Sequence, residues 1–472
     1  MPEEPTPTSL PPVRAGRPPQ QAAIVGVMLL VCTAGLGLRL WLGWWLGYLG
    51  DIQCWQLWGL DPGEYVPGSD DPSYLPLPKN YPPMYMCVVR IQRWVHRGLG
   101  LPGDYTRPLE LRFHDNPGAW RPLILYLKLP CMIADVATAW FLLGIGRQLG
   151  QAWRGVAAAA FYLFSPAILY DGAYYGQTDT ILVMFLVGAA WAWLGRKPVW
   201  WGAMMMGAPL MKVQALFALP VLGLAVLGRW GIWRPMFARV AAGAAGMLAA
   251  VVALSWWTGM LGQFYHGYFR LSLFYPLVTV RAFNFWWLLL RPWDKVPRMF
   301  DFPRDDVKLL GLVSLRWIGI ILFFSVLGLI LWRLHRARYS PRALALALAA
   351  AGWAFFNLPT QMHERYSVPA VGLMTLLIFW ERRWFWITLL VSCTAALNIA
   401  EVCYLFVPYR WMRDAVNYFI VGEMHPAWTL FAVIHVLMIP FLIERLWREG
   451  GVTRPFPVAE APAPAAQSPT RT

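Results

Sequence analysis

The chain has 472 residues, of which 58% are hydrophobic and only 14% charged, and it contains 29 tryptophans. Soluble domains average about 45–50% apolar and about 25% charged residues, so this composition excludes an ordinary soluble protein. The formal net charge of +15 could indicate nucleic-acid binding. In a membrane protein, basic cytoplasmic loops explain such a charge, and we expect no nucleic-acid partner.

Long apolar runs recur from Ala22 to Leu446. A run of about 20 residues crosses the hydrocarbon core as a helix, so the pattern predicts an all-α, polytopic integral membrane protein with about 12 transmembrane helices. The first run lacks a small-residue cleavage site and is longer than the apolar part of a signal peptide, so we expect a retained span. The predicted spans are 22–47, 121–146, 155–172, 178–195, 200–212, 213–228, 240–258, 312–332, 343–358, 367–380, 384–405 and 427–446.

The two ends of the chain differ from its middle. Residues 1–21 and 447–472 are rich in Pro, Ala and Thr and lack apolar periodicity, which predicts disordered tails around one transmembrane domain, residues 22–446. If the N-terminus is cytoplasmic, twelve crossings place both termini inside. Every short inner connector is then basic, whereas the outer segments DGAYYGQTD and NLPTQMHERYS together carry one Arg. This distribution follows the positive-inside rule and favours a multi-pass membrane protein with both termini in the cytoplasm. We expect the membrane to be a bacterial plasma membrane.

Two loops on the predicted outer face are long, residues 48–120 and 259–311. The first contains YPPMYMCVVRIQRWVHRGLG, which we interpret as an interfacial helix because a span here would place most basic connectors outside. Residues 200–228 are too long for one span and too short for two. They predict a broken or re-entrant pair around Met211–Lys212, although two crossings remain possible.

Ionisable residues gather at the predicted outer membrane boundary. Each is costly there unless it is paired or faces a wet cavity, so each is a candidate for function. Each also has an ordinary explanation, such as a helix end, a helix cap, a snorkelling lysine or a solvated loop. These residues are Asp51, Asp179, Lys212, His363, Glu364 and Arg365.

Three further charged residues lie within apolar spans, namely Arg39, Lys128 and Asp135. Lys128 and Asp135 are seven positions apart, which places them two turns apart on one helix face. We expect these two to form a structural pair.

The gathered residue types suit a substrate with a phosphate head and a lipid tail. Lys and Arg hold phosphate through charge-assisted hydrogen bonds. A carboxylate can accept the proton of an attacking hydroxyl. Sugar transfer from a lipid phosphate needs both groups, and a base opposite the leaving phosphate inverts the anomeric centre in one displacement, as in inverting glycosidases.

Five stretches together resemble a known family. They are Asp51 after the first span, YPP (Tyr81–Pro83), YYGQTD (Tyr174–Asp179), LMKVQALFALP (Leu210–Pro220) and MHERY (Met362–Tyr366). In order along the chain, they resemble the GT-C superfamily of polytopic glycosyltransferases that use polyprenyl-phosphate sugars. Within it they look most like the dolichyl-phosphate-glucose-dependent glucosyltransferases of N-glycan assembly and bacterial mannosyltransferase-like relatives.

The resemblance implies an inverting transferase of a hexose, mannose or glucose, acting on the extracytoplasmic face. Its donor would be a polyprenyl- or dolichyl-phosphate sugar in the bilayer, and its acceptor a lipid-linked glycan or glycolipid. The implied roles are a general base at Asp51, donor-phosphate binding by Lys212, His363 and Arg365, and sugar or acceptor contacts from Tyr81, Gln177, Asp179 and Glu364. Arg365 stands where the eukaryotic pattern has Lys, and Asp179 where it has Asn, so the sugar contacts stay open.

Other kinds of site have less support. No His, Cys or Asp cluster has zinc-ligand spacing and no Gly-rich phosphate loop occurs, so we expect no cofactor and no bound metal site, with the lipid-phosphate sugar as donor substrate. The sequence leaves the metal requirement of the reaction undetermined. The pair Asp70–Asp71 could replace the single base, but Gly68, Ser69 and Pro72 around it favour a turn. Cys54 and Cys87 share the first long loop and could pair in an oxidising compartment.

Two other function classes remain open. A polytopic transporter would also carry intramembrane charges, but the broken segment 200–228 has no counterpart suggesting inverted repeats. A non-catalytic protein that binds the lipid carrier has little need of an acidic residue opposite Lys and Arg. The sequence leaves the sugar, the acceptor and the oligomeric state undetermined.

Overall fold

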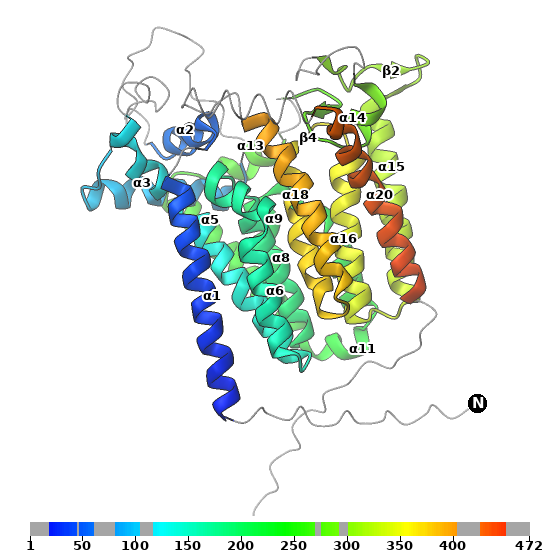
Figure 1. Ribbon diagram of the computed structural model, residues 1–472, viewed down its shortest axis with the longest axis horizontal. Helices are drawn as coiled ribbons and strands as arrows, with labels where there is room; N and C mark the ends of the chain where they lie inside the picture. Colours follow the sequence, from blue (N-terminus) through cyan, green and yellow to red (C-terminus); the bar gives the residue numbers. More distant parts are fainter. Residues whose placement is uncertain are drawn as a thin grey trace, which may run out of the picture.

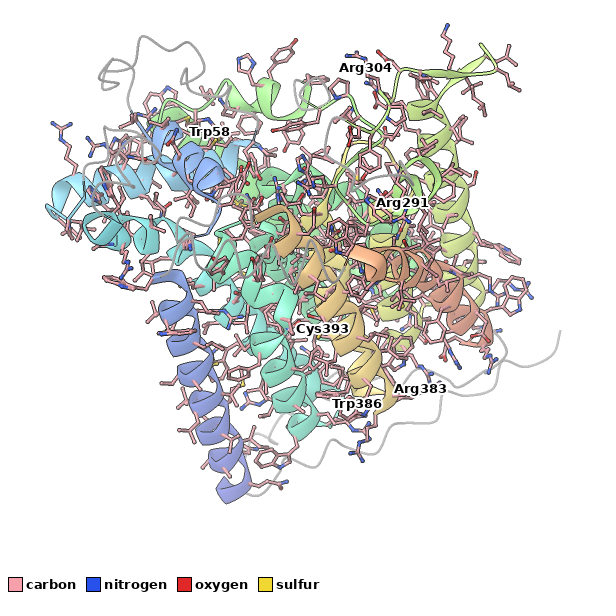
Figure 2. The ribbon with its side chains drawn as sticks, turned by 45° about the horizontal axis from the view of Figure 1, so that its top comes forward. Trp58, Arg291, Arg304, Arg383, Trp386 and Cys393 are labelled. Atoms are coloured by element: carbon pink, nitrogen blue, oxygen red, sulfur yellow. The ribbon has the colours of Figure 1, made fainter. Side chains whose placement is uncertain are left out.

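The chain forms a bundle of helices in the computed structural model, which describes residues 18–44, 47–60, 81–103, 117–269, 275–291, 301–403 and 425–449. Helix α1 begins, and α20 ends, at the end of the bundle opposite α2, α3 and β4 (Figure 1). Arg304 and Arg383 mark these two opposite ends in Figure 2. The long helices are α1 (Pro18–Trp44), α5 (Pro117–Gln148), α12 (Phe237–Trp257), α15 (Leu315–Arg336), α18 (Arg383–Cys403) and α20 (His425–Glu449).

Shorter helices complete the bundle. Those within it are α6 (Ala152–Phe164), α7 (Pro166–Ile168), η2 (Leu169–Tyr175), α8 (Asp179–Leu194), α9 (Pro198–Met211), η3 (Val213–Phe217), α10 (Leu219–Leu227), α16 (Pro341–Asn357), α17 (Val368–Met374) and η8 (Thr375–Phe379). Those at its ends are α2 (Leu49–Trp58), α3 (Pro83–Gly98), α11 (Trp230–Trp233), η4 (Arg234–Met236), α13 (Gln263–Phe269), α14 (Phe285–Leu290) and η7 (Glu364–Ser367).

The twelve predicted crossings are not all supported. Each predicted range contains helix, but among the described residues only six helices are long and apolar enough to cross a membrane, or seven if α6 and the bent segment after it form one span. The remaining ranges hold short or broken helices. The 14 residues of α9, for example, rise only about 21 Å, less than the hydrocarbon core. The chain is an all-helical, multi-pass membrane protein with fewer full-length spans than expected.

The shorter helices lie in the middle of the bundle. Helix α16 is buried on almost every side and packs against α15, α17 and α20, and α8 packs between α5 and α9. A helix that is hydrophobic all round is stable only when other helices surround it. Length and hydropathy alone could not separate such core helices from lipid-facing spans.

The predicted break in residues 200–228 is confirmed. Helix α9 ends at Met211, Lys212 is extended with φ −154° and ψ 132°, and η3 begins at Val213. A second irregular point follows η2, a π-helix, where Gly176 has φ +86°. This left-handed conformation favours glycine, and it turns the chain into α8 with Asp179 as its first residue.

Two small sheets form at the α2 end of the bundle. Strand β1 (Thr279–Val280) pairs in parallel with β4 (Met362–His363), and β2 (Lys308–Leu309) pairs antiparallel with β3 (Val313–Ser314). The β1–β4 pairing joins the second long predicted loop to the MHERY segment. That contact fixes the motif from a part of the chain 83 residues earlier in the sequence.

The predicted Lys128–Asp135 pair is wrong. Asp135 Oδ2 instead accepts a hydrogen bond from Arg39 Nε at 2.8 Å, and Lys128 Nζ donates to the Tyr174 carbonyl at 2.6 Å. Lys128 and Asp135 lie two turns apart along α5, whereas Arg39 of the neighbouring helix α1 contacts Asp135 directly. No disulfide joins Cys54 and Cys87, so the possible pairing does not form. The alternative acidic pair, Asp70–Asp71, and most of both predicted tails lie outside the described residues.

Candidate active site

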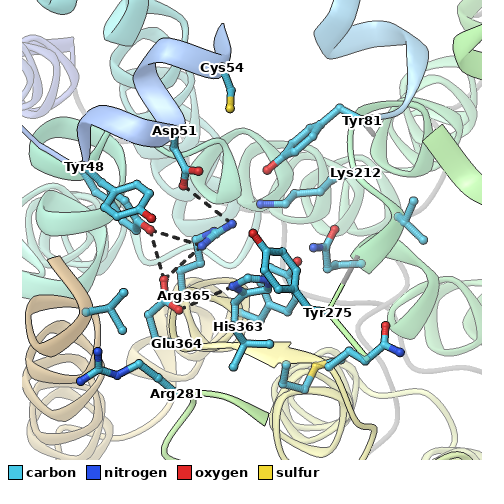
Figure 3. Close-up of a pocket in the computed structure, with 18 of the residues that line it drawn as sticks. Tyr48, Asp51, Cys54, Tyr81, Lys212, Tyr275, Arg281, His363, Glu364 and Arg365 are labelled. Carbon is cyan, nitrogen blue, oxygen red and sulfur yellow. Dashed lines mark hydrogen bonds and ion pairs between the residues drawn. The ribbon is translucent and has the colours of Figure 1, made fainter. Parts of the chain in front are cut away.

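A cavity of about 390 Å³ opens at the α2 end of the bundle (Figure 3). Segments from across the chain line it: α2, the start of α3, the Lys212 break, the β1 strand and the MHERY segment. Six of the eight residues proposed from the sequence line the cavity, and Gln177 and Asp179 lie directly behind them. The six are Asp51, Tyr81, Lys212, His363, Glu364 and Arg365.

Arg365 lies at the centre of the charged groups (Figure 3). Its Nη1 donates to Glu364 Oε1 at 3.1 Å and to the Tyr175 hydroxyl at 3.3 Å. Asp51 Oδ2 is 3.9 Å from Nη2, and Asp179 Oδ2 is 4.0 Å from Nε. The two longer contacts exceed hydrogen-bond length, so Coulomb attraction holds these carboxylates near the guanidinium without an aligned bond.

Lys212 has one close carboxylate partner and two aromatic neighbours. Its Nζ is 2.7 Å from Asp179 Oδ2, and both side chains are almost fully buried. The ammonium lies 5.7 Å from the Tyr81 ring centroid and 5.6 Å from that of Tyr366, within cation–π range. Within the described residues, neither Lys212 Nζ nor Arg365 Nε has an aligned hydrogen-bond acceptor. Lys212 and Arg365 both line the cavity, so an anionic ligand bound there would lie beside two cations.

Asp51 is held by a residue of the YYGQTD motif. The Gln177 amide donates to its Oδ2, and the side chain stays 24% exposed beside the cavity. Burial raises the pKa of Asp51, and the nearby Arg365 charge opposes part of that rise. A carboxylate with a raised pKa is a stronger base than an ordinary surface aspartate.

The pKa values of His363 and Glu364 are both lowered, which leaves the imidazole neutral and the carboxylate charged. Burial and the Arg365 charge lower the pKa of His363, so its imidazole is neutral at pH 7. Burial tends to raise the pKa of Glu364, but Arg365 and His363 outweigh it and bring the value down to about 2. Glu364 is therefore a permanent anion that orients Arg365, and His363 is a neutral hydrogen-bonding group.

A buried carboxylate outside the cavity holds this motif in place. Asp305 accepts hydrogen bonds from the Thr360 hydroxyl at 2.9 Å and the Gln361 amide at 2.8 Å. It also forms a bidentate pair with Arg316 at 2.9 and 2.8 Å. Gln361 has φ +63°, a conformation that non-glycine residues adopt only when their surroundings impose it. Asp305 thus fixes the two residues that precede Met362.

Several residues of the cavity were missed from the sequence. Arg281 lines it with φ +59° and pairs with the buried Glu401 of α18. None of the five stretches quoted from the sequence includes Arg281, because it lies in the second long loop, residues 259–311. Tyr175, Gln214 and Tyr366 lie inside quoted motifs and could have been proposed. The remaining aromatic lining includes Tyr48, Trp55, Trp58 and Tyr275.

Among the residues that the structure describes, no group of three or more His, Cys, Asp or Glu side chains could hold a metal ion. The acidic side chains of the cavity are instead drawn toward Arg365 and Lys212.

No family model matches this chain, and no curated protein sequence matches it. Among solved structures the chain is similar to the crystal structure of ArnT from Cupriavidus metallidurans bound to undecaprenyl phosphate. The identity is 18%, the match covers 92% of this chain and 78% of that chain, and the TM-score is 0.43. A likeness this distant establishes neither a family nor an activity, so the function has to be argued from the site itself.

Proposed function

We propose that the protein is an inverting glycosyltransferase that moves a sugar from a polyprenyl-phosphate carrier to a hydroxyl of a lipid-linked or glycan acceptor. The observation that carries the proposal is one cavity lined by a basic carboxylate, Asp51, and by two cations, Lys212 and Arg365. The GT-C-like order of the motifs agrees with it. A hexose, mannose or glucose, is the expected sugar.

The transfer itself needs one bond to form and one to break. The acceptor oxygen attacks the anomeric carbon while the bond from that carbon to the phosphate oxygen breaks, and the hydroxyl proton passes to Asp51. The leaving group is the polyprenyl phosphate, whose oxygens accept hydrogen bonds from Lys212 and Arg365. Attack opposite the leaving phosphate inverts the configuration at the anomeric carbon.

The charge balance of the cavity supports this division of roles. Asp51, Asp179 and Glu364 are three carboxylates beside two cations, so the cluster carries one excess negative charge while Asp51 is ionised. When Asp51 takes the proton, one negative charge disappears 3.9 Å from Arg365 as the departing phosphate gains one. Proton transfer and phosphate departure therefore assist each other electrostatically.

The remaining residues would hold the substrates. Tyr81 lines the cavity and would bind a sugar or acceptor hydroxyl directly. Gln177 and Asp179 would act through their contacts with Asp51 and Lys212. Neutral His363 would donate to a phosphate or sugar oxygen. We place the cavity on the extracytoplasmic face with both termini in the cytoplasm, because the short basic connectors lie at the opposite end of the bundle.

The decisive experiment is transfer in proteoliposomes. Radiolabelled polyprenyl-phosphate mannose and polyprenyl-phosphate glucose are supplied separately with a lipid extract as acceptor source. Wild type is compared with Asp51→Asn and with Asp306→Asn, a matched carboxylate that is exposed outside the cavity. Loss of a general base lowers the rate by about 10²–10⁴-fold, so we expect label transfer to disappear only in Asp51→Asn.

A measurement of carrier binding distinguishes the proposed base, Asp51, from the proposed phosphate ligands. The Asp51→Asn variant should still bind polyprenyl phosphate, because the proposed phosphate donors are intact. No transfer from either donor by wild type, with tight carrier binding, would favour a non-catalytic carrier-binding protein. Undiminished transfer by Asp51→Asn would remove the base assignment.

A further inference from the structure

A hairpin at the start of α15 carries an unusual tip. Strands β2 and β3 pair antiparallel, with Lys308 opposite Ser314 and Leu309 opposite Val313. Between them Leu310 has φ +50° and Gly311 φ +74°, and the Leu312 amide donates to the Leu309 carbonyl at 3.0 Å. Positive φ at both central positions is the pattern of a type I′ turn, which favours Asn-Gly or Asp-Gly.

Leucine is a poor choice at that position in water. Its side chain in the left-handed region costs about 1–2 kcal/mol. Leu310 is also 88% exposed and Leu312 78% exposed, so the tip presents apolar surface that folding does not bury. An exposed apolar tip in a strained turn indicates an apolar environment outside the protein.

The apolar surface of the hairpin continues onto a membrane-facing helix. An apolar groove of about 310 Å³ lies between the hairpin leucines and Ile318, Ile321 and Leu322 of α15. Helix α15 is one of the six candidate spans, and Trp317, Ile321 and Phe324 form an exposed stripe at helical spacing along it. The groove is therefore the outermost part of the lipid-facing side of α15.

The tryptophans of α15 place the hairpin at the membrane interface. Trp317 in the first turn of α15 and Trp332 near its end are both exposed, and tryptophans near the ends of a membrane-spanning helix are enriched at the membrane interfaces. The hairpin is attached directly before Trp317, at the end of the bundle marked by Arg304 (Figure 2). Lys308, at the base of the hairpin, is exposed and is a cation suited to lipid phosphate groups.

We propose that the hairpin of residues 307–314 is a lipid-binding element. Its leucine tip enters the interfacial layer of the bilayer, and the groove between the tip and α15 holds a hydrocarbon chain of a membrane lipid. The site is separate from the cavity around Asp51 and does not depend on the proposed transferase activity. A second copy of this chain is the competing occupant.

Spin-label accessibility tests the proposal. The native cysteines are replaced by serine, and single cysteines are introduced by Leu310→Cys, Phe324→Cys and Asp306→Cys in protein reconstituted into phosphatidylethanolamine–phosphatidylglycerol nanodiscs. Phe324 is the lipid-facing reference and Asp306 the water-facing one. We expect the ratio of oxygen to nickel-chelate accessibility at Leu310 to match Phe324 and to exceed Asp306 severalfold. A ratio at Leu310 that matches Asp306 would overturn the proposal.

A second variant separates lipid contact from folding. Leu310→Asn suits the turn conformation, so the melting temperature in detergent should be unchanged or slightly higher. A label at Val313→Cys, on the groove wall, should become severalfold more accessible to the nickel chelate in the Leu310→Asn background. An unchanged accessibility contradicts the lipid site. Dipolar broadening between Leu310→Cys labels on two protein copies would show that a second copy of this chain, and not a lipid, occupies the groove.

Discussion

Two of the buried groups of charged side chains that the structure describes are built differently. In the bundle, Arg39 and Asp135 meet at 2.8 Å, Tyr162 donates to the other carboxylate oxygen at 2.8 Å, and Arg39 also donates to the Leu163 carbonyl at 2.7 Å. At the cavity, Arg365 reaches Asp51 and Asp179 only at 3.9 and 4.0 Å. The first group is closed by short bonds, whereas the second surrounds a space.

The difference separates a structural ion pair from a binding site. Charges buried without a ligand are tolerated when short hydrogen bonds within the protein satisfy them, as around Asp135. The cavity group also contains a short pair, Lys212–Asp179 at 2.7 Å, but Arg365 reaches Asp51 and Asp179 only at 3.9 and 4.0 Å, and the group borders a cavity that a substrate can enter. Access to a cavity therefore distinguishes these two groups, although both contain an Arg and an Asp.

The largest expected effect is on stability, through the buried Arg39–Asp135 pair. Asp135→Ala leaves Arg39 buried without its carboxylate and should lower the free energy of unfolding by about 3–5 kcal/mol, because an uncompensated buried charge remains. Thermal unfolding in detergent measures this loss, and kcat of the remaining folded protein should be unchanged. Recovery in the Arg39→Met/Asp135→Ala double variant is the control. A stable Asp135→Ala protein with reduced kcat would place the pair in the active site instead.

At the cavity, Lys212→Met should weaken binding of polyprenyl phosphate by about 10- to 100-fold, the usual range for loss of a hydrogen bond to a charged group. Binding is measured by native mass spectrometry or by titration in detergent. The matched control is Lys197→Met, at the opposite end of α9.

Because Lys212→Met leaves Asp179 without its ammonium partner, a Lys212→Met/Asp179→Asn double variant guards against unfolding. Wild-type affinity in either folded variant would show that Lys212 only neutralises Asp179.

The smallest effect concerns pH. Asp51 must be deprotonated to accept a proton, so kcat/KM should fall as the pH drops through its raised pKa. Arg365 lowers that pKa and Glu364 raises it. Arg365→Gln should therefore move the acid limb to higher pH, by about one unit or more, and Glu364→Gln should move it to lower pH. Shifts in the same direction for both variants would mean that the acid limb of kcat/KM reports the titration of a group other than Asp51.

Much of the site could be recognised in the sequence because membrane insertion makes ionisable residues rare. Asp51, Lys212 and Arg365 stood out against apolar surroundings, and all three line one cavity. The break at Lys212 was also readable, since neither one span nor two fits residues 200–228. The roles of these residues as base and phosphate ligands stay predictions.

Other features had no local signal. Arg281 and Asp305 come from a long loop, and only the β1–β4 pairing and the bonds to Thr360 and Gln361 bring that loop to the motif. The number of full spans was overestimated because buried core helices such as α16 are as apolar as lipid-facing ones.

The sequence by itself determined that this is a helical membrane protein and that its ionisable residues converge near MHERY, because charge in an apolar chain is costly wherever it lies. Only the tertiary structure decided which charges are partners. Asp135 pairs with Arg39 rather than Lys128, and Arg365 lies among Asp51, Asp179 and Glu364, because pairing depends on distances between helices that spacing along one helix does not contain.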